Sequence, residues 1–372
     1  MKRFMGIINL GENESKIKEI TYNRPIASVP IGGRYRVIDF ILSNMVNAGI
    51  QNVAIFTQGK NRSLMGHLGS AKPWDLNRKY EGLFVINPVL EPEDTIIRKG
   101  DIESFKNNID YIQGSKQEYV LLTKSYMLYN IDFKKAFNYH IDSSSDITLI
   151  YKRVDNKDNR FIGCDNLTID EFNNLKSIGY NMGNDEFSNI SLETYILRKD
   201  LLIDIIKDSV SKGDSKYLKQ AIYNRMDKLK IDTFSFNGYL ACINSIENYY
   251  NTSMDLLDEK KYKDLFYENG LIYTKIKDEP STKYTSTSNI SNSIVANGCV
   301  IEGRVENSII ARGVTVKKGA VIKNSILMQK SLVNENAYLE NIILDKKVVV
   351  SEGKILSGNH NKPFVIKKNT FL

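Results

Sequence analysis

The chain has 372 residues, of which 42% are hydrophobic and 26% charged, and this composition is typical of a soluble globular protein with two domains. The net charge of +7 comes from lysines and arginines that are scattered along the chain, so a nucleic-acid-binding surface is not indicated. The mild basic balance suits small phosphorylated metabolites, although lysines that simply solvate a surface explain it as well.

The cysteines and the apolar segments of the sequence indicate no special site and no membrane segment. Three cysteines without paired spacing indicate neither a disulfide framework nor a zinc site. No apolar stretch reaches the roughly 18 residues that a membrane span needs, and the N-terminus does not have the pattern of a signal peptide. We therefore expect a cytoplasmic protein without a membrane partner.

Strand and helix patterns alternate through the first two-thirds of the chain. Compact apolar runs predict buried strands at residues 4–10, 52–57, 119–123 and 146–151. Apolar residues at helical spacing predict helices at residues 35–48 and 133–140. This alternation predicts an α/β domain at residues 1–255, with a mainly parallel sheet, helices on both faces and ligands at the carboxyl ends of the strands.

The pattern changes in the last third. Residues 256–288 are less periodic and end in a stretch rich in Ser and Thr, so they are predicted to form a linker. From there Asn-Ser-Ile recurs at 292, 307 and 324, and Asn-Ile-Ile follows at 341. Such recurrence is typical of a left-handed parallel β-helix built from hexapeptide repeats, here residues 289–372. A meander of short antiparallel strands is the alternative, and it does not explain the repeated motif.

One densely patterned segment carries a family resemblance. It contains Pro30-Ile31-Gly32-Gly33-Arg34-Tyr35-Arg36-Val37-Ile38-Asp39-Phe40, then Leu42-Ser43-Asn44, Asn47, Gly49, Thr57-Gln58 and Trp74-Asp75-Leu76. In this order and spacing the motifs are similar to those of bacterial glucose-1-phosphate adenylyltransferase (ADP-glucose pyrophosphorylase). The resemblance implies a Rossmann-like nucleotidyltransferase domain joined to a left-handed β-helix. It also implies the reaction of ATP with glucose 1-phosphate to give ADP-glucose and diphosphate.

The triphosphate loop departs from the family pattern. The family reads Gly-Gly-x-Gly-x-Arg-Leu, whereas this chain reads Asn9-Leu10-Gly11-Glu12-Asn13-Glu14-Ser15. A polyanion needs backbone N–H groups and a cation, and two carboxylates at this place would repel it by roughly several kcal/mol. If Glu12 and Glu14 point to solvent instead, the loop is a simple turn. In either case we expect no cation beside it to hold phosphates.

Three further positions depart from the family's catalytic residues. Ile26 stands at the family's lysine, Ser125 at the catalytic aspartate and Cys242 at the second metal-binding aspartate. A hydroxyl and a thiol are poor ligands for Mg²⁺. The lysine of a Glu-Lys-Pro motif that would hold glucose 1-phosphate is not found before Ser191. We therefore expect no catalytic residue, metal or cofactor in this chain, with Mg²⁺ used by a catalytic partner.

Three arginines remain as candidates for binding an anion. The resemblance implies an effector contact near the β-helix junction for Arg24, Arg34 and Arg36. An ion pair of Arg36 with Asp39 through helical spacing is an equally weighted alternative.

The retained frame and the lost catalytic positions are similar to the D-type regulatory subunit of this family. This resemblance implies a largely non-catalytic chain of bacterial glycogen biosynthesis that raises the activity of a catalytic glucose-1-phosphate adenylyltransferase subunit in a heterotetramer. A small phosphorylated effector or nucleotide is the other expected partner. The alternatives are a weakly active sugar-phosphate nucleotidyltransferase and a scaffold that binds no small molecule. A hexapeptide-repeat acyltransferase is disfavoured because residues 289–359 contain no histidine base.

Overall fold

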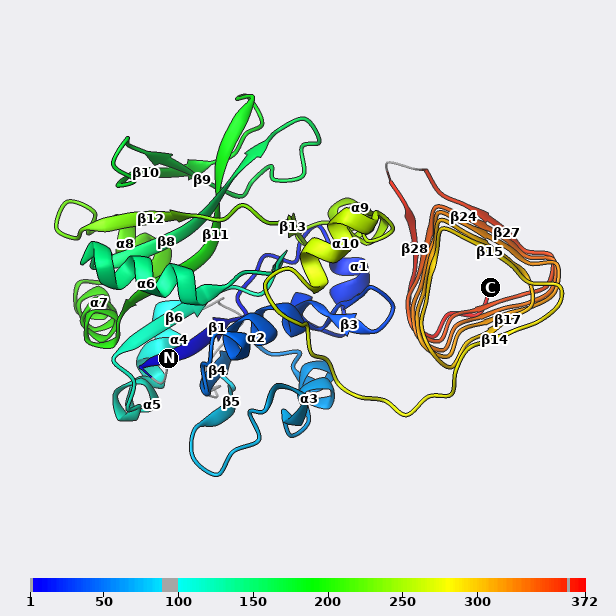
Figure 1. The fold of residues 1–372 in the computed structure, drawn as a ribbon, viewed down its shortest axis with the longest axis horizontal. Coiled ribbons are helices and arrows are strands. Elements are labelled where there is room, and N and C mark those ends of the chain that lie inside the picture. Colours follow the sequence, from blue (N-terminus) through cyan, green and yellow to red (C-terminus); the bar gives the residue numbers. More distant parts are fainter. Residues whose placement is uncertain (1–2, 89–99, 360–361) are drawn as a thin grey trace.

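The computed structural model of the protein describes residues 3–88, 100–359 and 362–372. Figure 1 shows an α/β domain beside a triangular stack of short strands, which is the C-terminal solenoid. The predicted fold class, an α/β nucleotidyltransferase-like domain followed by a left-handed β-helix, is confirmed. No helix among the described residues is long and apolar enough to span a membrane.

A mixed sheet forms the centre of the α/β domain. In the described residues it has nine strands, and its main path runs β10-β9-β11-β6-β1-β4-β5. The strands on this path are β10 (Leu175–Tyr180), β9 (Asp165–Ile169), β11 (Phe187–Arg198), β6 (Tyr119–Thr123), β1 (Phe4–Asn9), β4 (Asn52–Phe56) and β5 (Gly82–Ile86). β6, β1, β4 and β5 are parallel, and β11 joins them antiparallel to β6. β8 (Ile147–Asp155) pairs with β11 and with β12 (Ile231–Ser235).

Alternation along β1 builds an apolar core on each face of this sheet. Phe4 and Ile8 pack in one cluster with residues of α2 (Val37–Asn47) and α6 (Phe133–Ser143). Met5 and Ile7 pack in the other with residues of α4 (Asp101–Asn107), α5 (Ile109–Gly114), α7 (Lys199–Lys212) and α8 (Leu218–Tyr223). Each such side chain stabilises the fold by about 1.5–3 kcal/mol when it is fully buried. A strand buried on both faces explains why the sequence shows a continuous apolar run.

Short elements connect the sheet to the loops around it. They are α1 (Lys18–Thr21), the 3-10 turn η1 (Ile26–Ser28), β2 (Pro30–Ile31), β3 (Tyr35–Arg36), α3 (Arg62–Leu68), the 3-10 turn η2 (Lys72–Trp74), β7 (Met127–Tyr129) and β13 (Leu240–Cys242). β2 pairs with β3, and β13 pairs with β7, both antiparallel.

The predicted linker, residues 256–288, contains ordered elements that the sequence interpretation missed. After α9 (Ile246–Asp255), Asp258 caps α10 (Glu259–Phe266) by accepting the backbone N–H groups of Lys260 and Lys261. The chain then crosses α2, where Ser43 Oγ accepts the backbone N–H of Tyr273 at 2.8 Å. β14 (Lys283–Tyr284) is already the first strand of the β-helix. The Asp258 cap was the available signal for α10.

Three all-parallel sheets form the β-helix, so the antiparallel meander is wrong. The first sheet consists of β14, β17 (Val300–Ile301), β20 (Thr315–Val316), β23 (Leu332–Val333) and β26 (Val349–Val350). The second consists of β15 (Asn289–Ser291), β18 (Arg304–Glu306), β21 (Val321–Lys323), β24 (Tyr338–Glu340) and β27 (Ile355–Ser357). The third consists of β16 (Ile294–Val295), β19 (Ile309–Ile310), β22 (Ile326–Leu327), β25 (Ile342–Leu344) and β28 (Phe364–Ile366).

The repeated Asn-Ser-Ile has a physical role at one corner of the triangle. The asparagines adopt φ between +40° and +55°, a left-handed conformation that asparagine tolerates, at Asn292, Asn307, Asn324 and Asn341. The serines form a ladder, since Ser308 N–H donates to Ser293 Oγ and Ser325 N–H donates to Ser308 Oγ, each at 3.1 Å. Each turn of the chain therefore satisfies the backbone of the next turn.

The apolar pair that follows each serine joins the two domains. Ile310 and Leu327 point into the interior cluster of the β-helix, whereas Ile309 and Ile326 belong to a cluster shared with the α/β domain. This shared cluster includes residues of α9 and α10, which lie between the sheet and the β-helix in Figure 1. The middle strands of the third sheet, β19, β22 and β25, are therefore buried on both faces.

Candidate functional site

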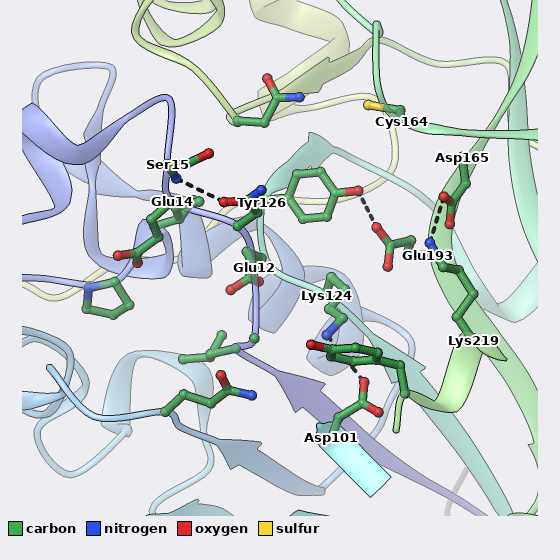
Figure 2. Close-up of a pocket in the computed structure, with 18 of the residues that line it drawn as sticks. Glu12, Glu14, Ser15, Asp101, Lys124, Tyr126, Cys164, Asp165, Glu193 and Lys219 are labelled. Atoms are coloured by element: carbon green, nitrogen blue, oxygen red, sulfur yellow. Dashed lines mark hydrogen bonds and ion pairs between the residues drawn. The ribbon is translucent and has the colours of Figure 1, made fainter. Parts of the chain in front are cut away.

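A cavity of about 900 Å³ opens at the carboxyl ends of neighbouring parallel strands, where the sequence interpretation expects ligands. Its walls include residues 10–16 after β1, residues 57–61 after β4 and residues around Lys124 after β6. Figure 2 shows the charged side chains of Glu12, Lys124, Asp165 and Lys219, from separate segments of the chain, around the same space. The cavity therefore has the position of a ligand site. The carboxylates and lysines that line it determine which ligands can bind.

Glu12 turns from the loop after β1 into this cavity. Its Oε1 accepts a hydrogen bond from the backbone N–H of Ser125 at 2.8 Å and another from Ser125 Oγ at 2.7 Å. Burial raises the pKa of the Glu12 carboxyl, and the ammonium group of Lys124 partly opposes this shift. The alternative that Glu12 points to solvent is wrong. The carboxyl group instead accepts both donors of Ser125, its backbone N–H and its hydroxyl.

Lysines lie close to the loop, which corrects the expectation that no cation remains beside it. A Cβ atom on Gly11 would stand 3.4 Å from Lys124 Nζ and 2.7 Å from Gln58 Nε2, so the chain approaches closely at this glycine. The lysines are paired with carboxylates of the chain itself, in Lys60–Glu14 (3.2 Å), Lys124–Asp101 (3.6 Å) and Lys219–Asp165 (2.8 Å). The position of Lys124 directly after a predicted strand could have identified it as a cavity residue. Lys60 and Lys219 lie in segments that the family motifs do not cover.

The side chains at the remaining degenerate positions are apolar or neutral. Ile26 lies in η1, is 1% exposed and belongs to the apolar cluster shared with the β-helix. Ser125 is buried against Glu12. Cys242 lies in β13 with its Sγ 3.5 Å from Cys164 Sγ, and burial raises the pKa of its thiol. These side chains do not supply the pair of carboxylates that Mg²⁺ prefers. Among the described residues, no group of three or more His, Cys, Asp or Glu could hold a metal ion.

Glu193 is a cavity residue whose role the sequence analysis did not foresee. It lies at an irregularity of β11, where the register shifts between Ser191 and Thr194, and its φ is +47°. Its carboxylate accepts a hydrogen bond from the Tyr126 hydroxyl, as Figure 2 shows. Burial, with the Glu193 charge as the next cause, raises the pKa of Tyr126 well above its ordinary value. A non-glycine residue in the left-handed region is strained, which marks this position as an unusual part of the cavity wall.

The three candidate arginines lie away from the cavity centre, at the junction with the β-helix. Arg24 is buried and forms an ion pair with Asp345 of the β-helix, 321 residues away in the sequence. The guanidinium of Arg36 donates to Ser63 O at 2.7 Å and to Ser63 Oγ at 3.0 Å. Asp39 accepts the backbone N–H of Arg36 at 2.9 Å and meets His67 Nε2 at 2.5 Å, so the alternative Arg36–Asp39 side-chain pair is not observed. Arg34 is exposed and lies over the ring of Tyr35.

More cations join these arginines from the chain that follows α10 and from the β-helix. The pKa of Lys346 is lowered to about 7, first by burial and then by the charges of Arg36 and Arg24. Burial also lowers the pKa of Arg36 to about 10, with Arg24 as an additional cause. The pKa values of Lys277 and Arg312 are lowered by burial and then by neighbouring arginines. We call Arg24, Arg34, Arg36, Lys277, Arg312 and Lys346 the junction cluster.

Family models match both parts of the chain. Residues 6–171 match the nucleotidyl transferase family, and residues 280–363 match the family described as GlmU-like, C-terminal hexapeptide. The second match begins close to β14, in agreement with the structural start of the β-helix.

Whole-chain relatives define the family more narrowly. The chain is 40% identical to the glycogen biosynthesis protein GlgD of Geobacillus stearothermophilus, over 99% of this chain and 97% of the relative. It is 36% identical to GlgD of Bacillus subtilis (strain 168), over 86% of this chain and 83% of the relative. It is also 31% identical to a glucose-1-phosphate adenylyltransferase of Fusobacterium nucleatum, over 86% of this chain and 84% of the relative. The chain therefore belongs to the glucose-1-phosphate adenylyltransferase family, in the group that contains the GlgD proteins.

Proposed function

We propose that this chain is a regulatory, non-catalytic subunit of bacterial glycogen biosynthesis, which acts in the cytoplasm on a catalytic glucose-1-phosphate adenylyltransferase chain. The names of its relatives support the place in glycogen biosynthesis. The observation that carries the non-catalytic role is the bonding of Glu12 to Ser125, because a carboxyl group of the chain occupies donors at the expected triphosphate position.

The charge of the cavity supports this proposal. Its lining includes the carboxylates of Glu12, Glu14, Asp101, Asp165 and Glu193 beside the ammonium groups of Lys16, Lys60, Lys124 and Lys219. Nucleotidyl transfer requires a surplus of positive charge, from cationic side chains and Mg²⁺, to neutralise phosphates during in-line displacement. The described carboxylates already outnumber the lysines around this cavity, and the metal ligands expected of the family are replaced by Ser125 and Cys242.

The junction cluster is the proposed site for a small phosphorylated effector. Lys346 and Arg36 are desolvated beside other cations, so a bound anion would relieve their mutual repulsion. Phosphate accepts hydrogen bonds from guanidinium and ammonium groups that lie on one face. Because the cluster takes residues from both domains, an anion held there would stabilise one arrangement of the α/β domain against the β-helix.

A reconstitution assay tests the proposal. Pyrophosphate release from ATP and glucose 1-phosphate is measured for this chain, for the catalytic subunit from the same organism and for a mixture. We expect little or no release by this chain alone, and turnover by the mixture several-fold above that of the catalytic subunit. Robust release by this chain alone would refute the non-catalytic role. Unchanged kinetics in a mixture that does assemble would support a scaffold without a regulatory function.

A further inference from the structure

Two of the three cysteines meet at the wall of the cavity. Cys164 lies in the turn before β9 and Cys242 lies in β13, 78 residues later, yet their sulfur atoms are 3.5 Å apart. Both side chains are buried, at 3% and 2% exposure. Cys242 occupies a position for which the family chemistry suggests a metal-binding carboxylate, and in this fold its sulfur faces another sulfur instead of a metal site.

We propose that Cys164 and Cys242 form a redox-active dithiol, which a peroxide oxidises to an intramolecular disulfide. A disulfide needs an S–S distance of about 2.05 Å, so the sulfur atoms have to approach by about 1.5 Å. Gly163, directly before Cys164, has a φ of +79° and open space around it. Small adjustments of this turn and of the Cys164 side chain can therefore close the gap without displacing the sheet.

The two sulfurs have different access to an oxidant. Cys164 is a lining residue of the cavity, whereas Cys242 lies behind it between β7 and the turn. Hydrogen peroxide that enters the cavity therefore meets Cys164 first, in the step RSH + H₂O₂ → RSOH + H₂O. The Cys242 thiol then attacks the sulfenic sulfur, the S–O bond breaks, a disulfide forms and a second water leaves. Two electrons pass from the dithiol to one peroxide, and the raised pKa of Cys242 makes the second step slow at neutral pH.

Cys299 provides a matched control within the same chain. It is also buried, at 2% exposure, but its Sγ lies against backbone oxygens of the β-helix, 3.2 Å from Ala311 O and 4.0 Å from Asn297 O, and not against a second cysteine. Trypsin separates the three cysteines into peptides 161–176, 231–260 and 284–304. A cross-link between any two of them is therefore visible as a single new species.

The experiment is a peroxide titration of the folded full-length chain at two or three pH values, followed by denaturation, thiol counting and peptide mapping. We expect the free thiols to fall from three to one, the mass to fall by about 2 Da, and peptides 161–176 and 231–260 to appear joined. Dithiothreitol should restore three thiols. Cys299→Ala should form the same cross-link, with its free thiols falling from two to none, whereas Cys164→Ala and Cys242→Ala should each abolish the cross-link.

Peptide mapping is done on the unmodified chain. The test of the disulfide therefore does not depend on whether a cysteine variant folds. Persistence of three thiols after peroxide has oxidised a reference dithiol in the same tube would overturn the proposal. Oxidation of Cys164 to a sulfinic acid without the cross-link would overturn it too, because it would show that Cys242 does not reach its neighbour. The outcome is independent of the regulatory function, since no catalytic partner is present.

Discussion

The cavity of the α/β domain and the junction cluster contain similar cationic groups in opposite electrostatic settings. In the cavity, Lys60, Lys124 and Lys219 each face a carboxylate of the same chain, and Glu12 adds a further negative group. At the junction, Arg24 pairs with Asp345, and burial, followed by the charges of Arg36 and Arg24, lowers the pKa of Lys346 to about 7. We therefore expect an anion to bind more weakly in the cavity, where the lysines are paired, than at the junction, where the cations of the junction cluster outnumber the neighbouring carboxylates Asp39, Glu279 and Asp345.

The largest effect is expected from breaking the buried ion pair that crosses the junction. Arg24→Ala leaves the carboxylate of Asp345 buried without its partner, which typically destabilises a protein by about 3–5 kcal/mol. The free energy of unfolding, measured by urea titration, should fall by this amount. Arg304→Ala is the control, because Arg304 pairs with Glu306 at the surface with half of its side chain exposed, and a loss below about 1 kcal/mol is expected there. Equal losses in the two variants would show that Arg24 does not join the domains.

An intermediate effect is expected from making the cavity more like the junction. Glu12→Gln keeps the shape of the side chain but removes its charge, so Lys124 is left with less negative charge around it. Tripolyphosphate, tested by isothermal titration calorimetry, should bind about tenfold more tightly than to the unmodified chain, which corresponds to about 1.4 kcal/mol. Glu14→Gln is the matched control, since Glu14 contacts the exposed Lys60, and a smaller gain is expected. An unchanged affinity of Glu12→Gln for tripolyphosphate would show that the charge of Glu12 does not prevent polyanions from binding in the cavity.

The smallest effect is a pH dependence at the junction. Lys346 is charged below its pKa of about 7 and neutral above it, so an anion should bind more weakly as the pH rises from 6 to 8.5. Sulfate is the appropriate probe because its own charge is constant over this range. We expect a several-fold loss of sulfate affinity across pH 7, and Lys346→Met should remove this pH dependence while Arg36, with a pKa of about 10, still binds. A sulfate affinity that stays flat in the unmodified chain would contradict the assignment of Lys346.

Lys346 also makes the free energy of unfolding depend on pH. Its pKa is lower in the folded chain than in the unfolded chain, so the unfolded chain binds more protons between about pH 7 and the ordinary pKa of lysine. The contribution of Lys346 therefore increases stability as the pH rises through this window. Lys346→Met should reduce the slope of unfolding free energy against pH above 7.

Local patterns were sufficient to predict much of the fold. The apolar runs that predicted β1, β4 and β6 are buried on both faces, and the Asn-Ser-Ile repeat marks successive corners of the β-helix. Each repeat contacts its nearest neighbours along the chain, so a periodic sequence contains the information for the stack. The family motifs also predicted departures at Ile26, Ser125 and Cys242, and the loss of catalysis that these departures imply stays a prediction. The helix α10 was missed because a single cap, Asp258, is a weak signal beside a polar segment.

What the tertiary structure alone decided is which residues face each other. The sequence suggested a carboxylate in the phosphate loop. The hydrogen bonds of Glu12 with Ser125, 113 residues away in the sequence, form because β1 and β6 are neighbouring strands of the sheet. The sequence suggested three candidate arginines, but the partner of Arg24 comes from the β-helix. It suggested that Cys242 lacks metal chemistry, but not that Cys164 lies against it. Such pairings follow from chain topology and interdomain packing. The periodicity of apolar residues within one segment does not contain this information.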